Sequence, residues 1–170
     1  QSGSNKLLKA MRRRYDRNHY RDKVNLIKSL DPSACIGADV IVGFPGETDD
    51  DFLDTYNFIK DLDLAYLHVF SFSERDNTDA KSYQNSVSKT ERSERSRILR
   101  NLSDRKRHLF QEQYLNSTRE VLFESMKSGY TIGYSDNYIQ VKVPQSSELI
   151  NSIHPVNLKK EEGGVVFGEL

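Results

Sequence analysis

One run of residues, 37–48, constrains the fold more than any other part of this 170-residue chain. It reads GADVIVGFPGET, an apolar and β-branched stretch that ends in glycine and proline and leads into a helix-forming segment. Such a run is typical of a buried parallel strand followed by a tight turn and a helix. Because parallel strands need long crossover connections, the chain must also supply further helices and a neighbouring strand.

The flanking segments supply these elements. A first helix is expected over 4–15, where a serine can cap its start, and a second helix over 20–30. Thr48 and Asp51 predict a capping box at the beginning of a third helix. A second apolar strand is expected over 66–72. The order helix, strand, helix, strand predicts an α/β fold with a right-handed crossover.

The second half of the chain has a different pattern. A long basic helix is expected over 89–114, after a polar loop at 73–87. Beyond it, short strands alternate with turn residues, over 120–126, 130–134, 138–143, 153–158 and 165–170. Five short strands in about 55 residues are typical of a small barrel of the oligonucleotide-binding (OB) kind. The sequence therefore predicts an α/β domain over 1–112 and an all-β domain over 113–170.

The end of the strand at 37–44 is the first candidate for a ligand site. Ligands of α/β folds bind at the carboxyl ends of strands, and glycine lets a flat ligand approach the backbone. A phosphate loop is excluded, because the Walker lysine is missing and Asp49, Asp50 and Asp51 would repel phosphate. A neutral or cationic ligand is expected here. The alternative is a strand–turn–helix joint without a ligand.

The charges are unevenly distributed, although Lys and Arg together number 25 and so do Asp and Glu. Residues 1–28 hold nine basic and two acidic residues, a net charge of +7, whereas residues 31–63 have a net charge of −8. This asymmetry permits a surface that binds polyanions, and the alternative is a set of solvated helix surfaces. Residues 113–170 carry a net charge of −2, which is poor for sequence-independent phosphate binding. Any RNA affinity there is expected from stacking on tyrosines, unless these only close the barrel.

Cysteine and histidine usage limits the metal chemistry of the chain. Cys35 is the only cysteine, which excludes an internal disulfide and a Cys-only metal site. The four histidines are scattered without ligand spacing, so no metal site is expected. No apolar run approaches the ~18 residues that a membrane-spanning helix needs. Since the chain starts with Gln1 instead of Met, we expect it to be a fragment. The absence of a spanning run, of a signal-peptide pattern and of paired cysteines favours a cytoplasmic protein.

The run at 37–48 resembles the fifth-strand motif of the radical S-adenosylmethionine methylthiotransferases. Residues 1–15, which contain QSGS and MRRRY, are similar to the segment that follows the family's fourth strand, and 67–80 resembles its sixth strand. The sequence HVF at 68–70 is most similar to the corresponding sequence in the branch that methylthiolates N6-threonylcarbamoyladenosine beside the tRNA anticodon. Residues 113–170 resemble the RNA-binding TRAM barrel appended to these enzymes.

The resemblance implies the C-terminal half of a radical-SAM partial (β/α) barrel, followed by an OB-like TRAM barrel. It also implies S-adenosylmethionine as a cofactor and two [4Fe–4S] clusters in the parent enzyme, whose cysteine ligands are not in this chain. At 76–77, Asp-Asn replaces the family's usual Pro-Gly. The cofactor contacts that the resemblance implies are Ser2, Ser4, Ile41, Gly43, Phe44, Glu47, Val69 and Phe70. The contacts expected with tRNA are Arg12, Arg13, Arg75, Tyr130, Tyr134 and Tyr138.

The resemblance thus implies part of an enzyme that adds a 2-methylthio group to N6-threonylcarbamoyladenosine by radical chemistry. Without the cluster cysteines, the chain alone is expected to be inactive and to hold no catalytic residue. The alternatives are the same chemistry on another tRNA base or on a ribosomal protein, and a stand-alone RNA-binding module. The sequence does not identify the electron donor or the sulfur donor of this reaction. A half barrel also leaves strand edges unpaired, so we expect the isolated chain to self-associate.

Overall fold

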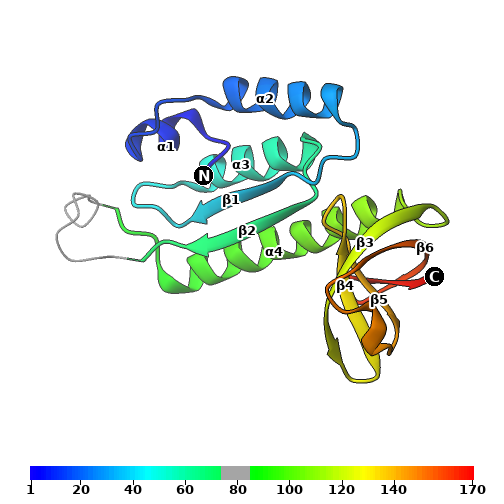
Figure 1. The fold of residues 1–170 in the computed structure, drawn as a ribbon. Coiled ribbons are helices and arrows are strands. Elements are labelled where there is room, and N and C mark those ends of the chain that lie inside the picture. The colour runs from blue at the N-terminus through cyan, green and yellow to red at the C-terminus, as the bar shows by residue number, and fades with distance from the viewer. Residues whose placement is uncertain (74–84) are drawn as a thin grey trace. The chain divides into compact units, whose positions relative to one another are not determined.

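A computed structural model describes residues 1–73 and 85–170 (Figure 1). Arg75 and the replacement at 76–77 therefore lie outside the described residues. The chain divides into two compact units, Gln1–Asp104 and Arg105–Leu170. The helix α4 (Lys89–Glu112) has residues in both units. The domain boundary at residue 112 stays a prediction.

The first unit alternates helices with two strands, in the predicted order. After α1 (Asn5–Ala10) and α2 (Arg17–Leu30) come the strands and helix of the central motif, β1 (Gly37–Val42), α3 (Asp49–Asp61) and β2 (Tyr66–Ser71). The two strands pair in parallel, with Gly37 opposite Tyr66 and Val42 opposite Ser71. The α/β architecture is therefore confirmed.

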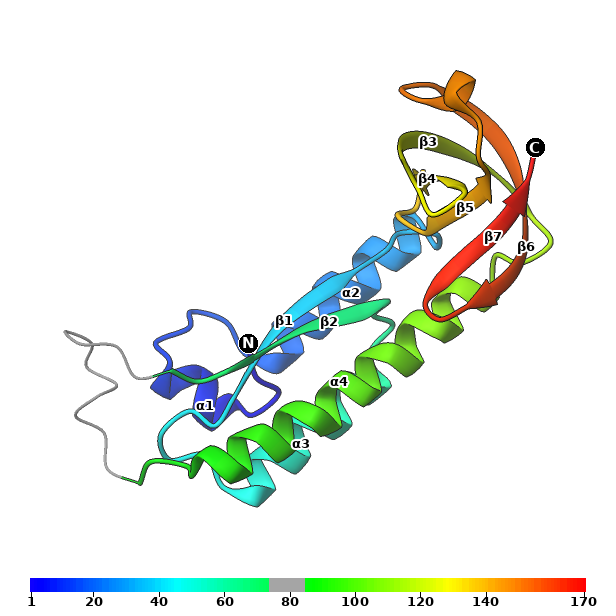
Figure 2. The same cartoon turned by 90° about the horizontal axis from the view of Figure 1, so that it is seen from below.

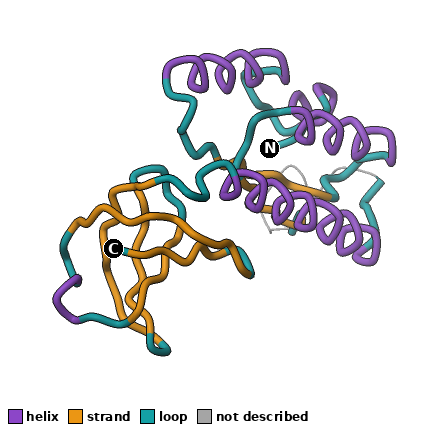
Figure 3. Tube along the Cα trace, turned by 90° about the vertical axis from the view of Figure 1, so that its right-hand side faces the viewer, coloured by secondary structure: helices purple, strands orange, loops and turns teal. Residues whose placement is uncertain are grey.

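One face of the strand pair is covered by helices. The helices α2, α3 and α4 run alongside β1 and β2 (Figures 1 and 3). Val40 and Val42 of β1 and Leu67 of β2 form a core with side chains of these three helices, namely Val24, Phe58, Ile59, Leu99 and Leu102. Burial of this apolar surface is the main force that holds the unit together.

The opposite face of the strand pair is open within the first unit. Asp39 and His68 are exposed, Ile41 is half-buried, and Phe70 is 53% exposed. These side chains share a face because side chains alternate along a strand and the register pairs Ile41 with Phe70. Such a surface is what the inner face of an incomplete barrel would present.

The beginning of the chain differs from the prediction. The first helix ends at Ala10 instead of near residue 15, because the chain turns at Arg12, whose φ is +57°. The second helix begins at Arg17 instead of residue 20, because the Asp16 carboxylate caps it by accepting from the His19 N–H over 2.8 Å. The predicted capping box of Thr48 and Asp51 is present.

Both outer edges of the strand pair are partly occupied by the protein itself. On the β1 side, the Ile41 N–H donates to the Gln1 carbonyl over 3.0 Å. On the β2 side, the Leu67 N–H donates to the Ser103 hydroxyl over 2.8 Å. Pairing of this kind covers part of an edge that would otherwise recruit another strand. Self-association of the chain stays a prediction.

The second unit is a closed barrel with strand order β3-β4-β5-β7-β6. Figure 2 shows β6 and β7 side by side as an antiparallel pair, and only β5 and β7 pair in parallel. Val121, Phe123, Val141, Val156, Leu158 and Val166 are fully buried inside. The predicted barrel is confirmed. Its elements are β3 (Thr118–Lys127), β4 (Tyr130–Ser135), β5 (Gln140–Pro144), the 3-10 helix η2 (Ser147–Leu149), β6 (Ile153–Glu162) and β7 (Val165–Glu169).

Candidate functional site

The turn after β1 lies where the sequence predicts a ligand site. Gly43 and Gly46 have φ angles of +74° and +84°, a region that favours glycine. A Cβ at Gly43 would collide with Cγ of Arg92, so the α4 side chain lies directly on this glycine. At the same end of the sheet, the rings of Phe44 and Phe72 meet edge to face with centroids 5.3 Å apart.

Glu47 anchors this turn from the inside. Its Oε2 accepts the Gly43 N–H over 2.6 Å and the Arg95 guanidinium over 2.7 Å. Arg95 also donates to Asp49 over 2.7 Å. Burial raises the pKa of Glu47, and the hydrogen bonds from Gly43 and Arg95 only partly offset this effect. Glu47 therefore joins the turn to α4.

The QSGS segment is attached to α3 by buried hydroxyl groups. The Ser2 hydroxyl lies 3.0 Å from that of Thr55, and the Ser4 hydroxyl donates to Asp51 over 2.9 Å. A Cβ at Gly3 would lie 2.7 Å from Cα of Thr55, so only glycine permits this close approach. The two serines are buried, and their hydrogen bonds keep the segment on the helix.

Asp51 is the centre of this polar cluster. Its Oδ2 accepts from the Lys6 ammonium over 2.6 Å and from the Thr48 hydroxyl over 2.9 Å. Burial alone would raise the pKa of Asp51, but the hydrogen bonds from Lys6, Thr48 and Ser4 outweigh it and lower the pKa to about 2. The ionised carboxylate is thus a structural link between the segment before α1 and the start of α3.

Of the eight predicted cofactor contacts, Ile41 and Phe70 alone present side chains together on the open face. Val69 packs against the core on the helix side. Phe44 and Glu47 are buried, with 7% and 6% of their surface exposed. Gly37 is covered as well, because a Cβ there would lie 2.5 Å from the Tyr66 ring. Gly37 at the start of β1 and Gly43 just after its end are therefore both covered by side chains of the protein itself.

The residues predicted to contact tRNA lie in several places. Arg12 and Arg13 are exposed in the turn after α1, and Arg13 donates to the Gln1 side chain over 2.8 Å. On the barrel, the Tyr130 ring lies edge to face with Phe167, and the Lys142 ammonium is 5.9 Å from each ring centroid. This cluster combines aromatic surface with a positive charge.

Tyr134 and Tyr138 form a separate aromatic pair, with ring centroids 5.9 Å apart. Tyr138 has a φ of +63° and is 74% exposed. Both line a groove of about 490 Å³ whose other described walls include Glu120, Glu124 and Asp136. Three carboxylates beside the rings disfavour a phosphate backbone there.

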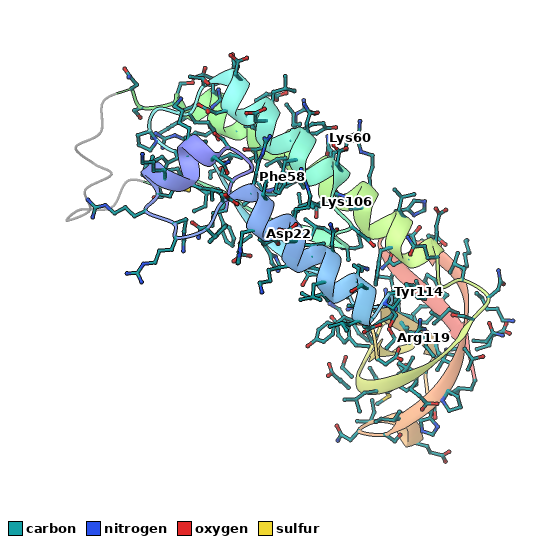
Figure 4. All side chains as sticks on the ribbon, turned by 90° about the horizontal axis from the view of Figure 1, so that it is seen from above. Asp22, Phe58, Lys60, Lys106, Tyr114 and Arg119 are labelled. Atoms are coloured by element: carbon teal, nitrogen blue, oxygen red, sulfur yellow. The ribbon has the colours of Figure 1, made fainter. Side chains whose placement is uncertain are left out.

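Sequence reasoning missed the residues that complete these contacts. Thr55 binds Ser2, and Arg92 and Arg95 cover the glycine turn. In the basic run of α4 no local signal distinguishes an arginine that pairs with Glu47 from one on the surface. In the second unit, the Arg119 guanidinium lies 4.5 Å from the Tyr114 ring centroid (Figure 4). Neither residue has a sequence pattern that predicts this contact.

Two further features concern metals and membranes. In residues 1–73 and 85–170, no cluster of three or more His, Cys, Asp or Glu side chains is arranged to bind a metal ion. In the same part of the chain, no helix has the length and apolar character needed to span a bilayer.

These features define a class of protein: an α/β unit whose two parallel strands leave one face open, joined in one chain to a closed five-stranded β-barrel. No protein-family model matches the chain. MtaB of Bacillus subtilis (strain 168), a threonylcarbamoyladenosine tRNA methylthiotransferase, is 38% identical over 165 residues, which are 94% of this chain and 37% of that protein. MtaB of Aquifex aeolicus (strain VF5) is 38% identical over 142 residues, 84% of this chain and 34% of that protein.

A relative that is named for a different substrate is also similar. The tRNA-2-methylthio-N(6)-dimethylallyladenosine synthase of a Nitratiruptor species is 34% identical over 171 residues, which cover 100% of this chain and 40% of that protein. Over most of its length the chain is thus similar to tRNA methylthiotransferases, MtaB enzymes among them. It spans between about a third and two fifths of the length of these relatives.

Proposed function

We propose that the chain is part of a cytoplasmic enzyme that adds a 2-methylthio group to N6-threonylcarbamoyladenosine next to the anticodon of tRNA. The observation that carries this proposal is the 38% identity to MtaB over 94% of the chain. The 34% identity to the dimethylallyladenosine synthase favours dimethylallyladenosine as the second candidate substrate.

S-adenosylmethionine is the proposed cofactor, and when bound to a reduced iron–sulfur cluster it supplies radical chemistry. The fit of this chain rests on Ile41 and Phe70, which are paired in register and present apolar surface on the open face. An adenine ring can lie against such a surface. The buried turn at Gly43 and Glu47 would hold the strand ends that carry these two side chains. Three cluster cysteines cannot come from this chain, because Cys35 is its only cysteine.

We propose that the described residues bind the cofactor and the tRNA and do not themselves carry out the chemistry. Ile41 and Phe70 would form one wall of the cofactor pocket, while the barrel would contact the anticodon stem-loop through Tyr130 and Lys142. The chain by itself is proposed to be inactive. We further propose that it self-associates through strand edges when isolated from the rest of the protein.

Nucleoside mass spectrometry tests the proposed substrate. The whole reading frame is expressed in a bacterium that lacks its own methylthiotransferases, and total tRNA is digested to nucleosides. The expected product is 2-methylthio-N6-threonylcarbamoyladenosine, while residues 1–170 expressed alone should form none. Methylthiolated dimethylallyladenosine as the main product would establish the second candidate. Absence of both products from cells with the intact, folded protein would contradict the proposal.

A further inference from the structure

A groove between the end of β2 and the start of α4 is not accounted for by the proposed cofactor site. It has a volume of about 940 Å³ and lies within the first unit. Four basic side chains line it: Lys89, Arg92, Arg97 and Arg100. Six serines also line it, and its described lining residues include no Asp or Glu. Arg97 is paired with Glu94 of the same helix over 2.6 Å, so the charge of the groove comes mainly from the other three cations. Cations and hydroxyl donors without carboxylates are the groups that bind phosphate oxygens.

The groove uses one side of α4. Lys89, Ser93 and Arg100 line it at helical spacing, so they share a face. Arg95 and Leu99 belong to the other side, where Arg95 pairs with Glu47 and Leu99 is fully buried. Among the basic residues in the first half of this helix, Arg95 therefore serves the fold, whereas Lys89, Arg92, Arg97 and Arg100 line the groove.

One buried hydroxyl in the groove lacks a partner. Ser96 is 4% exposed and lines the groove, and its Oγ forms no hydrogen bond with any described residue. Leaving a buried hydroxyl unpaired costs about 1–3 kcal/mol, so this group is ready to donate to a ligand. Lys89 and Arg100 also make no ion pair within the part of the chain that the structure describes.

The end of β2, where Ser71 and Phe72 line the groove, also turns one backbone N–H outward. The Phe72 N–H donates to Val42 of β1 over 2.8 Å, whereas the Leu67 N–H points to the outer edge and meets Ser103. Because successive N–H groups of a strand point to opposite edges, the Ser71 N–H also points outward. Arg92 holds this end by donating to the Phe72 carbonyl over 3.0 Å and to the Ser86 hydroxyl over 2.8 Å.

We propose that this groove binds successive phosphate groups of an RNA backbone. The cations extend from Lys89 to Arg100, which spans about 16 Å of helix and exceeds the reach of a single phosphate group. The groove would hold the sugar–phosphate chain through its cations and hydroxyls, groups that contact phosphate oxygens whatever the base sequence. Identification of the polyanion as RNA rests on the proposed function, and the phosphate chemistry rests on the groove itself.

The test measures binding of an anticodon stem-loop RNA to the 170-residue chain by fluorescence anisotropy, between about 50 and 200 mM KCl. The variant is Lys89→Gln with Arg100→Gln, and the matched control is Lys9→Gln with Lys23→Gln, two exposed lysines elsewhere in the same unit. We expect the groove variant to bind about three- to tenfold more weakly. Its slope of log K against log salt should fall by about 1.5, since each single-strand phosphate contact contributes about 0.7. The control should bind within about twofold of the unchanged chain.

Equal weakening by the control pair, or no weakening by the groove pair, would overturn the proposal. A second measurement locates the site, because the amide signals of Ser93, Ser96 and Asn101 should shift in nitrogen–proton NMR spectra when RNA is added. Inorganic phosphate and pyrophosphate are titrated separately. Shifts with these ions and none with RNA would identify a free-anion site instead.

Ser96→Ala separates ligand binding from folding. Alanine is favourable in a helix and removes only a hydroxyl that lacks a partner, so the helical circular dichroism signal should be unchanged. RNA affinity should fall by about two- to fivefold, and unchanged affinity would count against a phosphate at this position. Because the readout is RNA binding by this chain, failure here leaves the nucleoside assay of the proposed function unaffected.

Discussion

Arg95 of α4 and Glu47, at the end of the glycine turn, form an ion pair over 2.7 Å, and their side chains are only 7% and 1% exposed. The same Glu47 oxygen accepts the Gly43 N–H, so one carboxylate fixes the backbone turn and the helix that covers it. The position of the turn at the end of β1 thus depends on an ion pair with α4, a helix that packs on the covered face of the strand pair.

Truncation of Glu47 should therefore destabilise the first unit strongly. Glu47→Ala leaves a buried guanidinium and the Gly43 N–H without their acceptor, which costs about 3 kcal/mol. Asp49→Asn removes the other partner of Arg95, but the Asp49 side chain is 95% exposed and the cost should stay within about 1 kcal/mol. Urea denaturation followed by circular dichroism measures both, and equal losses for the two variants would show that burial does not control this pair.

Gly3 should be sensitive for a steric reason. A Cβ there would lie 2.7 Å from the Thr55 Cα and 2.9 Å from the Phe58 Cβ, so Gly3→Ala must push the segment off α3. We expect a loss of about 1–3 kcal/mol in the free energy of unfolding. Gly46→Ala is the control, because nothing lies within 4 Å of its Cβ position and only its φ of +84° opposes the change. A larger loss at Gly46 than at Gly3 would rule out steric contact as the cause.

The strands and caps were predictable from local patterns, because each depends on residues close in sequence. Thr48 and Asp51 are three residues apart, and their capping box is present. The Ser2–Thr55 contact and the Glu47–Arg95 pair join residues 53 and 48 positions apart, and no local pattern encodes them. The first helix was predicted too long for a different reason, because the local cap that Asp16 supplies to α2, which makes a turn necessary before it, was overlooked.

The sequence predicted the strand ends at which the candidate site lies, but not the side chains that cover its glycines. The predicted ligand edge does lie at the carboxyl ends of two adjacent parallel strands. The glycines were expected to leave room for a flat ligand, yet Arg92 and Tyr66 lie on them. A glycine in a sequence shows only that a side chain is absent. Whether a ligand or a distant side chain of the same protein uses the space is decided by tertiary packing.

Stability should depend on pH through Asp51. The pKa of its carboxyl in the folded chain is about 2, below its ordinary value of 3.8, so the folded state favours the ionised form. The resulting stabilisation is fully present above about pH 5 and is lost as the pH falls from about 4 to 2. We expect about 1–2 kcal/mol, because the Lys6 partner is 62% exposed and screened by solvent.

Unfolding free energies at about pH 6 and about pH 3 measure part of this effect, because the first condition lies above the expected window and the second lies within it. Asp51→Asn should reduce the difference between the two conditions, because the amide does not titrate. Asp54→Asn, an exposed position on the same helix, should leave it unchanged. The same pH dependence in the Asp51 variant and the unchanged chain would assign the acid sensitivity to other carboxylates.

The barrel tyrosines should differ in their contribution to RNA binding. Tyr130 lies beside Phe167 and Lys142, whose charge attracts a backbone, whereas Tyr138 lines a groove with Glu120, Glu124 and Asp136. A stacked base contributes about 1–3 kcal/mol, so Tyr130→Ala should weaken binding of a stem-loop RNA by about five- to 150-fold. Tyr138→Ala should change affinity by less than about twofold, because phosphate is repelled from the carboxylates around it. Titration of both variants with the same labelled RNA checks this, and a larger loss for Tyr138→Ala would place the RNA on the acidic side of the barrel.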